Sequence, residues 1–468
     1  MPTRTRVRSG RADDPRPAPA PAWILAGRAW VRGQLRPLEV GIDDDGRISV
    51  IGRALRGGPR HDVGDRLILP SATDLHVHFR RPEPWSGSEN YGSGTIQAAV
   101  GGVGLVGEMP NSEPPAITAD RVVELRERGS GRLAVDLLQY GAVTTSRRVP
   151  PLARECGAFK LYLSPTTGVE EVPDEELAPL LAAVAATGLP LSVHAEDPAE
   201  FRAPEAATNA AEWDHARPLD SELDAVVRVM AAAPPGLRLH IAHVTSAEVA
   251  ERVRTAGHSC EATPHHLLLA AKEGYGSRFK VNPPLREERV RSELFDRFAA
   301  GEIPCLASDH APHPVEAKDR PFAATPSGMP GVATMLPLLL NESRSGTIEL
   351  PRLLLAACER PARWFGVPRG RIAVGHRADL LVVDPRIRRP VRGELDSGPT
   401  GWSAFEGWEG IFPLEHYLGG ERIVEDGEYV GRPTGRVVRP EYAPASTGPV
   451  RGMRADPGAN FPGALEAL

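Results

Sequence analysis

Two histidines separated by one residue, His76 and His78, follow the apolar segment 67–70. In a β-strand, alternate side chains point to the same side, so we expect both imidazoles to face one point. Two convergent imidazoles suit a borderline-soft divalent metal such as zinc. A carboxylate, Asp309, follows a second apolar segment, 303–307. These residue types predict a metal site assembled from parts of the chain that lie far apart in sequence.

A histidine pair on a strand is a weak signal by itself, because buried histidines with satisfied hydrogen bonds are common. The prediction sharpens because three more apolar segments carry a residue that could bind metal near their ends. These residues are Lys160, His194 and His243. We interpret His240, His265 and His266, which lie near the same segments, as structural residues or supports of the ligands.

The elements that must position these side chains alternate in type along the chain. Candidate strands end at His78, Asn111, Val143, Leu163, His194, His243, His265 and His310. Helical patterns occupy residues 118–128, 175–186, 221–233, 246–256, 286–299 and 332–340. Eight strands alternating with helices predict an α/β fold, a (β/α)8 TIM-like barrel, in which chemistry takes place at the carboxyl ends of the strands.

Short apolar stretches separated by turns occur before this region and return after it, which predicts a small β-sandwich domain built from both ends of the chain. We assign residues 23–70 and 366–438 to that domain and residues 71–365 to the barrel. Residues 1–22 are rich in Arg, Pro and Ala and are expected to be a disordered extension. Residues 439–468, rich in Pro and Gly, are expected to be a flexible tail.

The composition is that of a globular protein, with 468 residues, 41% hydrophobic and 25% charged. A net charge of −6 argues against nucleic acid or an anionic membrane as partner. The four cysteines form no Cys-x-x-Cys pair, which indicates reduced thiols in a cytoplasmic protein. We find neither a membrane-spanning apolar run nor the hydrophobic core of a signal peptide.

The motifs His-x-His, Phe-Lys-Leu-Tyr-Leu around Lys160 and Ser-Asp-His-Ala-Pro-His around Asp309 resemble those of the cyclic amidohydrolases of the amidohydrolase superfamily, most closely the dihydroorotases. The similarity extends from about residue 23 to residue 431. It implies two zinc ions per subunit. The ligands implied by the family's pattern are His76, His78, Lys160, His194, His243 and Asp309.

Lys160 is the unusual member of this set, because an ammonium group has no lone pair and would repel a metal ion. The resemblance implies that carbon dioxide carboxylates this lysine, and that the carbamate bridges both zinc ions. Such chemistry needs a neutral amine, which burial favours by lowering the pKa. The resemblance also implies a catalytic role for Asp309, which would carry a proton from the attacking water to the leaving amide nitrogen.

The substrate side of the site distinguishes dihydroorotases from hydantoinases, dihydropyrimidinases and allantoinases, which share the metal ligands. Dihydroorotate carries a carboxylate, and the family binds it through positions that match Arg80, Asn111 and His313, with Asn282 as a further pocket residue. We therefore expect reversible, zinc-dependent hydrolysis of L-dihydroorotate to N-carbamoyl-L-aspartate, a step of de novo pyrimidine biosynthesis.

Two alternatives stay open. A hydantoinase or allantoinase would prefer rings without a carboxylate, and a non-catalytic chain would bind aspartate transcarbamoylase without turnover. The loop 81–91 departs from the usual family sequence, and Thr166-Thr167 resembles a threonine pair that closes over substrate in some dihydroorotases. By analogy with the family, we expect a homo-oligomer.

Overall fold

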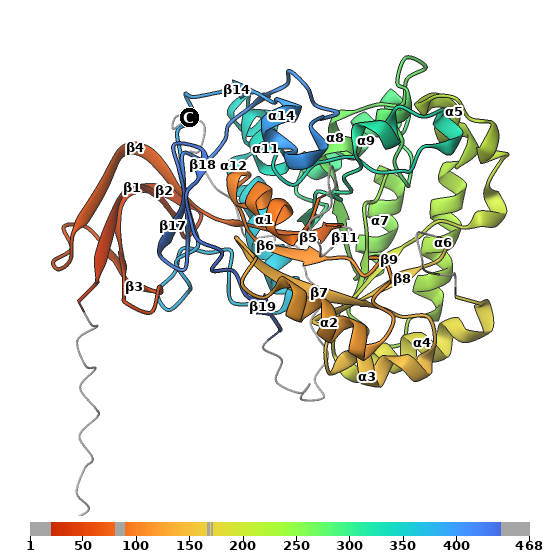
Figure 1. Ribbon diagram of the computed structural model, residues 1–468, viewed down its shortest axis with the longest axis horizontal. Helices are drawn as coiled ribbons and strands as arrows, with labels where there is room; N and C mark the ends of the chain where they lie inside the picture. Colours follow the sequence, from red (N-terminus) through yellow and green to blue (C-terminus); the bar gives the residue numbers. More distant parts are fainter. Residues whose placement is uncertain (1–19, 80–88, 166–168, 170–171, 441–468) are drawn as a thin grey trace, which may run out of the picture.

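The structure is a computed structural model that describes residues 20–79, 89–165, 169 and 172–440 (Figure 1). Three residues singled out in the sequence, Arg80, Thr166 and Thr167, lie outside the described residues. Most of the two terminal segments, for which we predicted disorder and flexibility, lies outside them as well. The described chain forms a large barrel and a smaller β domain beside it (Figure 1).

Eight parallel strands form the barrel and follow one another in sequence order around it. They are β5 Ala72–Val77, β6 Val103–Glu108, β7 Asp136–Ala142, β8 Ala158–Tyr162, β9 Leu191–His194, β10 Leu239–Ile241, β11 Ser259–Ala262 and β12 Cys305–Leu306. Past the end of β12, a parallel bridge between Val77 and His310 links the last strand to the first. The N–H of His78 donates to the carbonyl of His310 over 2.7 Å. The predicted (β/α)8 barrel is confirmed.

The longer helices lie around the outside of the barrel (Figure 1). The helices of the described residues are α1 Tyr91–Val100, α2 Ala119–Gly129, α3 Val149–Ala153, α4 Asp174–Thr187, α5 Ala210–Ala216, α6 Leu219–Ala232, α7 Ala247–Thr255, α8 Pro264–Leu268, α9 Glu288–Ala299, α10 Val315–Lys318, α11 Met335–Arg344, α12 Leu350–Leu354, α13 Arg360–Phe365 and α14 Gly393–Asp396. Several begin where a side chain caps the first turn: Thr118 accepts from the N–H of Arg121, and Ser246 accepts from that of Val249. The six predicted helices match α2, α4, α6, α7, α9 and α11 within a few residues.

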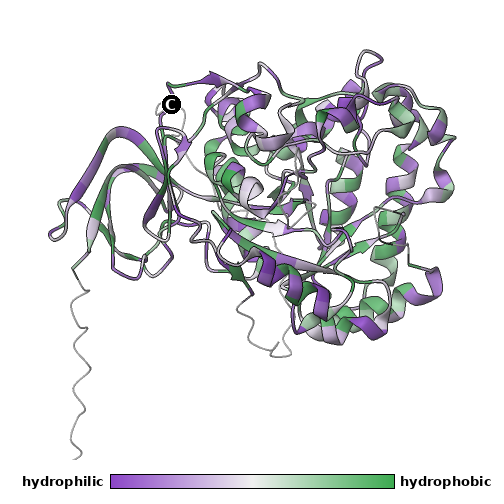
Figure 2. Cartoon of the chain, in the orientation of Figure 1, coloured by the Kyte–Doolittle hydropathy of each residue, from purple (hydrophilic) through white to green (hydrophobic). Residues whose placement is uncertain are grey.

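The barrel strands are buried over their whole length, which explains why their sequences read as apolar runs rather than alternating ones. Figure 2 shows hydrophobic colour along these strands, whereas the surrounding helices carry polar residues on part of their surface. The polar side chains near the strand ends are therefore held in a largely apolar surrounding.

The β domain is one eight-stranded sheet to which both ends of the chain contribute. Its strands, in spatial order, are β18 Glu428–Tyr429, β17 Glu421–Glu425, β16 Glu415–Leu418, β13 Leu380–Val383, β4 Arg60–Pro70, β1 Trp23–Val31, β2 Gln34–Ile42 and β3 Ile48–Gly52. The two ends meet where β4 pairs antiparallel with β13, so that Pro70 lies opposite Leu380. The domain has its own core, which includes Leu25, Val40 and Val382.

Two segments that we assigned to the β domain contact the barrel instead. Strand β19, Val437–Val438, pairs in parallel with Leu137 and Leu138 of β7. Strand β8 begins opposite Tyr140, so this stretch of β7 has room for another partner on that side. Strands β14 Arg389–Pro390 and β15 Glu409–Gly410 form a small separate ladder that packs on α11.

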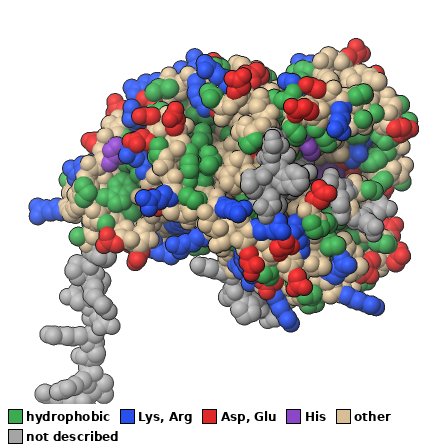
Figure 3. All heavy atoms as spheres, viewed as in Figure 1, with side chains coloured by type: hydrophobic (Ala, Val, Ile, Leu, Met, Phe, Trp, Pro, Cys, Tyr) green, Lys and Arg blue, Asp and Glu red, His purple; other side chains and the backbone are tan. Residues whose placement is uncertain are grey.

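Acidic and basic side chains are interspersed over the face shown in Figure 3. Within the described ranges, every helix falls short of the length and apolar character that crossing a bilayer requires.

Candidate metal centre

His76, His78 and Asp309 meet at the carboxyl end of the barrel. Nε2 of His76 lies 3.1 Å from Nε2 of His78. Oδ1 of Asp309 lies 3.2 Å from the first nitrogen and 3.1 Å from the second. All three residues are buried, and they form a group that could hold a metal ion. The predicted convergence of the two imidazoles and the carboxylate is therefore observed.

Hydrogen bonds on the far side of each ring fix which nitrogen faces this point. Nδ1 of His76 donates to Oε1 of Glu261 over 2.7 Å, and Nδ1 of His78 donates to Oδ1 of Asn111 over 2.6 Å. Burial lowers the pKa of His76 well below its ordinary value, which keeps this ring neutral. The neutral His76 ring then directs its Nε2 lone pair at Nε2 of His78 and at the carboxylate oxygen of Asp309, an arrangement that a cation between them would stabilise.

A second histidine pair lies beside the first. Nδ1 of His194 lies 3.0 Å from Nε2 of His243, and the ring centroids of His243 and His76 are 5.2 Å apart. Nε2 of His194 donates to Oε2 of Glu196 over 2.7 Å, which again leaves the opposite nitrogen directed at the neighbouring ring. One ring of each pair, His76 or His194, is thus oriented by a carboxylate behind it, as metal-binding histidines usually are.

Glu196 is itself fixed by Arg217. The guanidinium donates to both carboxylate oxygens, over 3.0 and 2.6 Å. Burial would raise the pKa of Glu196, but Arg217 and His194 outweigh it and hold the pKa well below the usual range. The carboxylate therefore stays charged and can strengthen His194 as a ligand.

A positive charge on Lys160 would lower the pKa of His76 and of His243, one ring from each histidine pair. Its side chain is fully buried, and Nζ has no hydrogen-bond partner among the described residues. Burial lowers the pKa of Lys160 to about 8, against the opposing effect of Glu261 and Asp309. An orphaned, easily deprotonated amine fits the carbamate that we predicted at this position.

Two residues of the centre adopt backbone angles that non-glycine residues rarely show. φ is +37° at His243 and +46° at Asp309. Such conformations cost about 1–3 kcal/mol each and persist where the surroundings enforce them, most often at functional sites. Here they direct two predicted ligands towards the centre.

The structure describes three of the four predicted substrate residues. Asn111 is buried and its side-chain oxygen accepts a hydrogen bond from His78, so Asn111 orients a predicted ligand. Asn282 is half-buried and accepts from Nε1 of Trp213 over 3.1 Å. His313 is half-buried, and its Nε2 donates to the carbonyl of Ser327 over 3.0 Å. Arg80 lies outside the described residues.

The motifs in the sequence did not reveal the residues behind the predicted ligands, namely Glu261, Glu196 and Arg217. Glu261 is the single charged residue in the buried strand β11, and Glu196 follows His194 by two residues. A charged residue within a short segment that is otherwise uncharged was the available signal for Glu261. His240 donates to Glu261 over 3.1 Å and is therefore a support, as predicted.

Comparison with known proteins agrees with this geometry. A protein from Halobacterium salinarum named dihydroorotase is 35% identical over 416 residues, which cover 87% of this chain and 97% of that protein. A protein from Rubrobacter xylanophilus named allantoinase is 33% identical over 451 residues, covering 89% and 97%. The solved structure of an L-hydantoinase from Arthrobacter aurescens matches with a TM-score of 0.82 and 26% identity, over 89% of this chain and 99% of that one.

The sequence profile of the Amidohydrolase family matches residues 67–409, which include every residue of the centre described above. On this match, and on relatives more than 30% identical along nearly their whole length, the chain belongs to the amidohydrolase family.

Proposed function

We propose that the protein is a dihydroorotase, which hydrolyses L-dihydroorotate reversibly to N-carbamoyl-L-aspartate. The observation that carries the hydrolytic part is the buried amine of Lys160, which has no hydrogen-bond partner among the described residues, together with the two histidine pairs and Asp309. The choice of substrate rests on the relatives from Halobacterium salinarum and from Methanosarcina acetivorans, 35% and 32% identical, which are both named dihydroorotase.

His76, His78, Lys160, His194, His243 and Asp309 would hold two zinc ions. Lys160 can bind metal only after its neutral amine attacks the carbon of carbon dioxide and releases a proton. The product is an anionic carbamate with two oxygen donors. When bound, the metals supply Lewis acidity that polarises the substrate carbonyl and makes water acidic near neutral pH.

Asp309 is the proton carrier of this proposal. Its oxygen lies within 3.2 Å of Nε2 of both His76 and His78, so we propose that it deprotonates the attacking water. The carboxylate takes that proton and returns it to the ring nitrogen as the carbon–nitrogen bond breaks. In the reverse direction, the same group accepts the proton of the attacking nitrogen.

Arg80, Asn111 and His313 are proposed to bind the substrate carboxylate, with Asn282 as a further pocket residue and with Asn111 also orienting His78. An arginine fork and polar donors suit a planar carboxylate. The corresponding neutral rings of hydantoinases and allantoinases would leave these groups unpaired, which would disfavour such substrates.

The test is turnover by zinc- and bicarbonate-loaded protein, followed through the ultraviolet absorbance of L-dihydroorotate, with hydantoin and allantoin in parallel. We expect turnover of dihydroorotate, its loss in Asp309→Asn, and its retention in Asp384→Asn, which changes a carboxylate of the β domain paired with Arg386. Turnover of a neutral ring alone would favour the allantoinase or hydantoinase alternative.

The same proposal includes a cytoplasmic location, a role in de novo pyrimidine biosynthesis and a homo-oligomeric state. The four cysteines are free and buried, which is consistent with a reducing compartment. If metal-loaded protein binds aspartate transcarbamoylase on a sizing column but turns over none of the three substrates, the non-catalytic alternative is favoured.

A further inference from the structure

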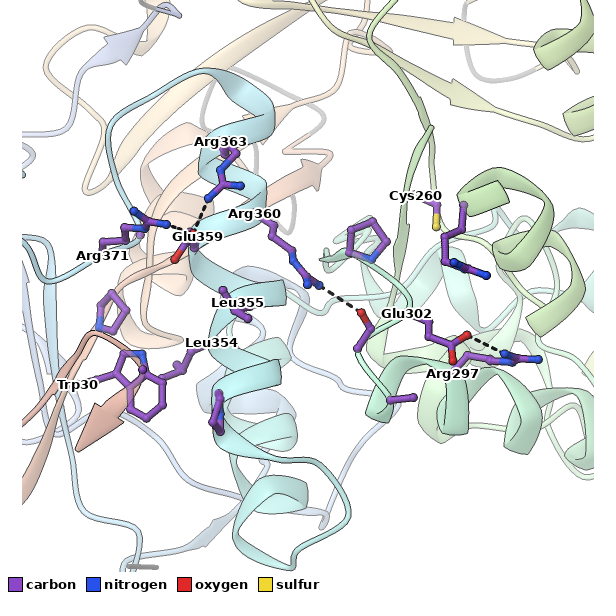
Figure 4. A pocket seen from close by; sticks show the side chains of 18 of the residues that line it. Trp30, Cys260, Arg297, Glu302, Leu354, Leu355, Glu359, Arg360, Arg363 and Arg371 are labelled. Atoms are coloured by element: carbon purple, nitrogen blue, oxygen red, sulfur yellow. Dashed lines mark hydrogen bonds and ion pairs between the residues drawn. The ribbon is translucent and has the colours of Figure 1, made fainter. Parts of the chain in front are cut away.

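A large cleft lies at the end of the barrel away from the metal centre, next to the β domain. It has a volume of about 1470 Å³. Cys260 of β11 and Pro304, just before β12, line it at the amino ends of their strands, whereas Asp309 lies beyond the carboxyl end of β12. Trp30 of β1 forms part of its wall from the β domain (Figure 4). The cleft is therefore separate from the proposed catalytic centre.

The lining of this cleft is strongly basic. It contains six arginines but only three glutamates, a surplus of three positive charges. The paired groups are Arg254 with Glu251, Arg297 with Glu302, and both Arg363 and Arg371 with Glu359. Arg32 and Arg360 have no ion pair within the described part of the chain. The protein as a whole carries a net charge of −6, so the local surplus opposes the overall balance.

Arg360 is the central cation of the cleft. Its side chain extends from α13 towards the side formed by Glu302 and Arg297 (Figure 4). It is half-buried, yet among the described residues its guanidinium donates one long hydrogen bond, of 3.4 Å, to the carbonyl of Gly301. Burial lowers the pKa of Arg360, and the nearby Cys305 and Glu359 oppose this shift without cancelling it. A guanidinium has five N–H donors, and the carbonyl of Gly301 accepts only one weak hydrogen bond from them, so the group can also bind an anion.

An irregular helix turn presents this arginine. The five residues before α13, Leu355–Glu359, form one π-helical turn, a rare element found disproportionately at functional sites. Gly370 packs directly against it, since a Cβ there would lie 2.2 Å from the carbonyl oxygen of Cys358. The turn is thus locked in place by a close backbone approach that only glycine allows.

We propose that this cleft binds a small molecule that carries more than one phosphate group. A phosphate ester with several negative charges would neutralise the surplus positive charge of the cleft. Its oxygens would accept hydrogen bonds from the N–H groups of Arg360. Arginine is well matched to phosphate oxygens, and the volume is sufficient for a drug-sized ligand. The flat side chain of Trp30 offers an apolar wall for the carbon part of such a ligand.

The experiment is isothermal titration of full-length, zinc-loaded protein with fructose 1,6-bisphosphate at low salt, with fructose as the uncharged control. We expect saturable binding of the bisphosphate, no binding of fructose, and weakening as salt is added. In Arg360→Gln, the affinity should fall by about 10- to 100-fold, the typical effect of losing charge-assisted hydrogen bonds. The matched control is Arg252→Gln, an exposed arginine of α7 paired with Glu248 outside the cleft.

Three results would overturn the proposal: no binding of the bisphosphate, equal binding by wild type and Arg360→Gln, or binding that disappears when zinc is removed but survives Arg360→Gln. The last result would place the anion at the metal centre. If Arg360→Gln fails to fold, hydrogen exchange in wild-type protein decides the matter. Slower exchange with bisphosphate over residues 351–363 supports the cleft, and unchanged exchange there contradicts it.

Discussion

Oε1 of Glu261 accepts a hydrogen bond from Nδ1 of His76 over 2.7 Å, across 185 residues of sequence. The second oxygen of the same carboxylate accepts from His240 over 3.1 Å. One buried carboxylate on β11 therefore fixes two rings, that of the predicted ligand His76 and that of His240 on β10.

The first prediction concerns this contact. Glu261→Gln removes the negative charge that orients the His76 ring and raises the basicity of its Nε2, so zinc affinity should fall about 10- to 100-fold. Competition with a chelating dye measures this affinity. Glu415→Gln is the matched control, because Glu415 contacts His61 over 2.9 Å in the β domain. An equal loss of affinity in both variants would contradict a specific role for Glu261.

The second prediction concerns the buried ion pair between Glu196 and Arg217. Arg217→Met leaves the Glu196 carboxylate buried without its cation, which should lower the free energy of unfolding by about 3–5 kcal/mol. Adding Glu196→Gln to the same protein should restore most of that loss, because the unpaired charge is gone. Urea unfolding of metal-free protein measures both variants. If the double variant is no more stable than the single one, the loss comes from packing rather than charge.

The third prediction concerns Trp402, whose Nε1 donates to the carbonyl of His313 over 2.8 Å. Trp402→Phe keeps an aromatic ring but removes this donor, so the segment that carries His313 should be held less firmly. If His313 binds the substrate carboxylate, KM for dihydroorotate should rise several-fold while kcat changes little. Steady-state kinetics separate the two constants. A fall in kcat at constant KM would show that Trp402 acts on the chemical step instead.

The fourth prediction concerns pH and the buried His416. Its Nδ1 donates to the carbonyl of Ala99 and its Nε2 accepts from the hydroxyl of Ser71, each over 2.8 Å. Burial lowers the pKa of His416 to about 4 from 6.5. The unfolded chain therefore takes up a proton at a higher pH than the folded protein does. The resulting stabilisation is complete above pH 6.5 and is lost as the pH falls towards 4.

Between pH 7 and pH 5 this single group should cost about 2 kcal/mol of unfolding free energy. His416→Gln, which can still donate and accept, should show a correspondingly smaller loss over the same interval. Urea unfolding at both pH values provides the comparison, and metal release at low pH affects both proteins alike. Identical pH dependence in the two proteins would show that His416 contributes nothing to it.

The sequence predicted the barrel well because its signals are local. Each strand is an apolar run, and residues such as His194 and Asp309 follow such runs directly. The parallel topology then brings every strand end to one face, so the clustering of the ligands follows from the fold. The resemblance to a known family added the role of Lys160, which spacing alone could not supply.

Contacts that depend on tertiary packing were not predictable in this way. Glu261 and Arg217 belong to no short motif, and their partners lie on other elements. The dual position of Asn111 behind His78 emerges only when two strand ends are placed side by side. The basic cleft at the amino ends of the barrel strands could not be predicted either, because it brings together Trp30 and Arg360, which are more than three hundred residues apart in sequence.

The pairing of β19 with β7 has a consequence for any altered version of this chain. Val437 and Val438 cover the backbone of Leu137 and Leu138, a stretch that would otherwise be a free strand edge. Ending the chain before Gly435 would expose that edge, which is a template for self-association with other copies. A tag or fusion partner attached after residue 440 leaves the pairing of β19 with β7 in place. A chain that ends before Gly435 should aggregate on heating even where its catalytic centre is intact.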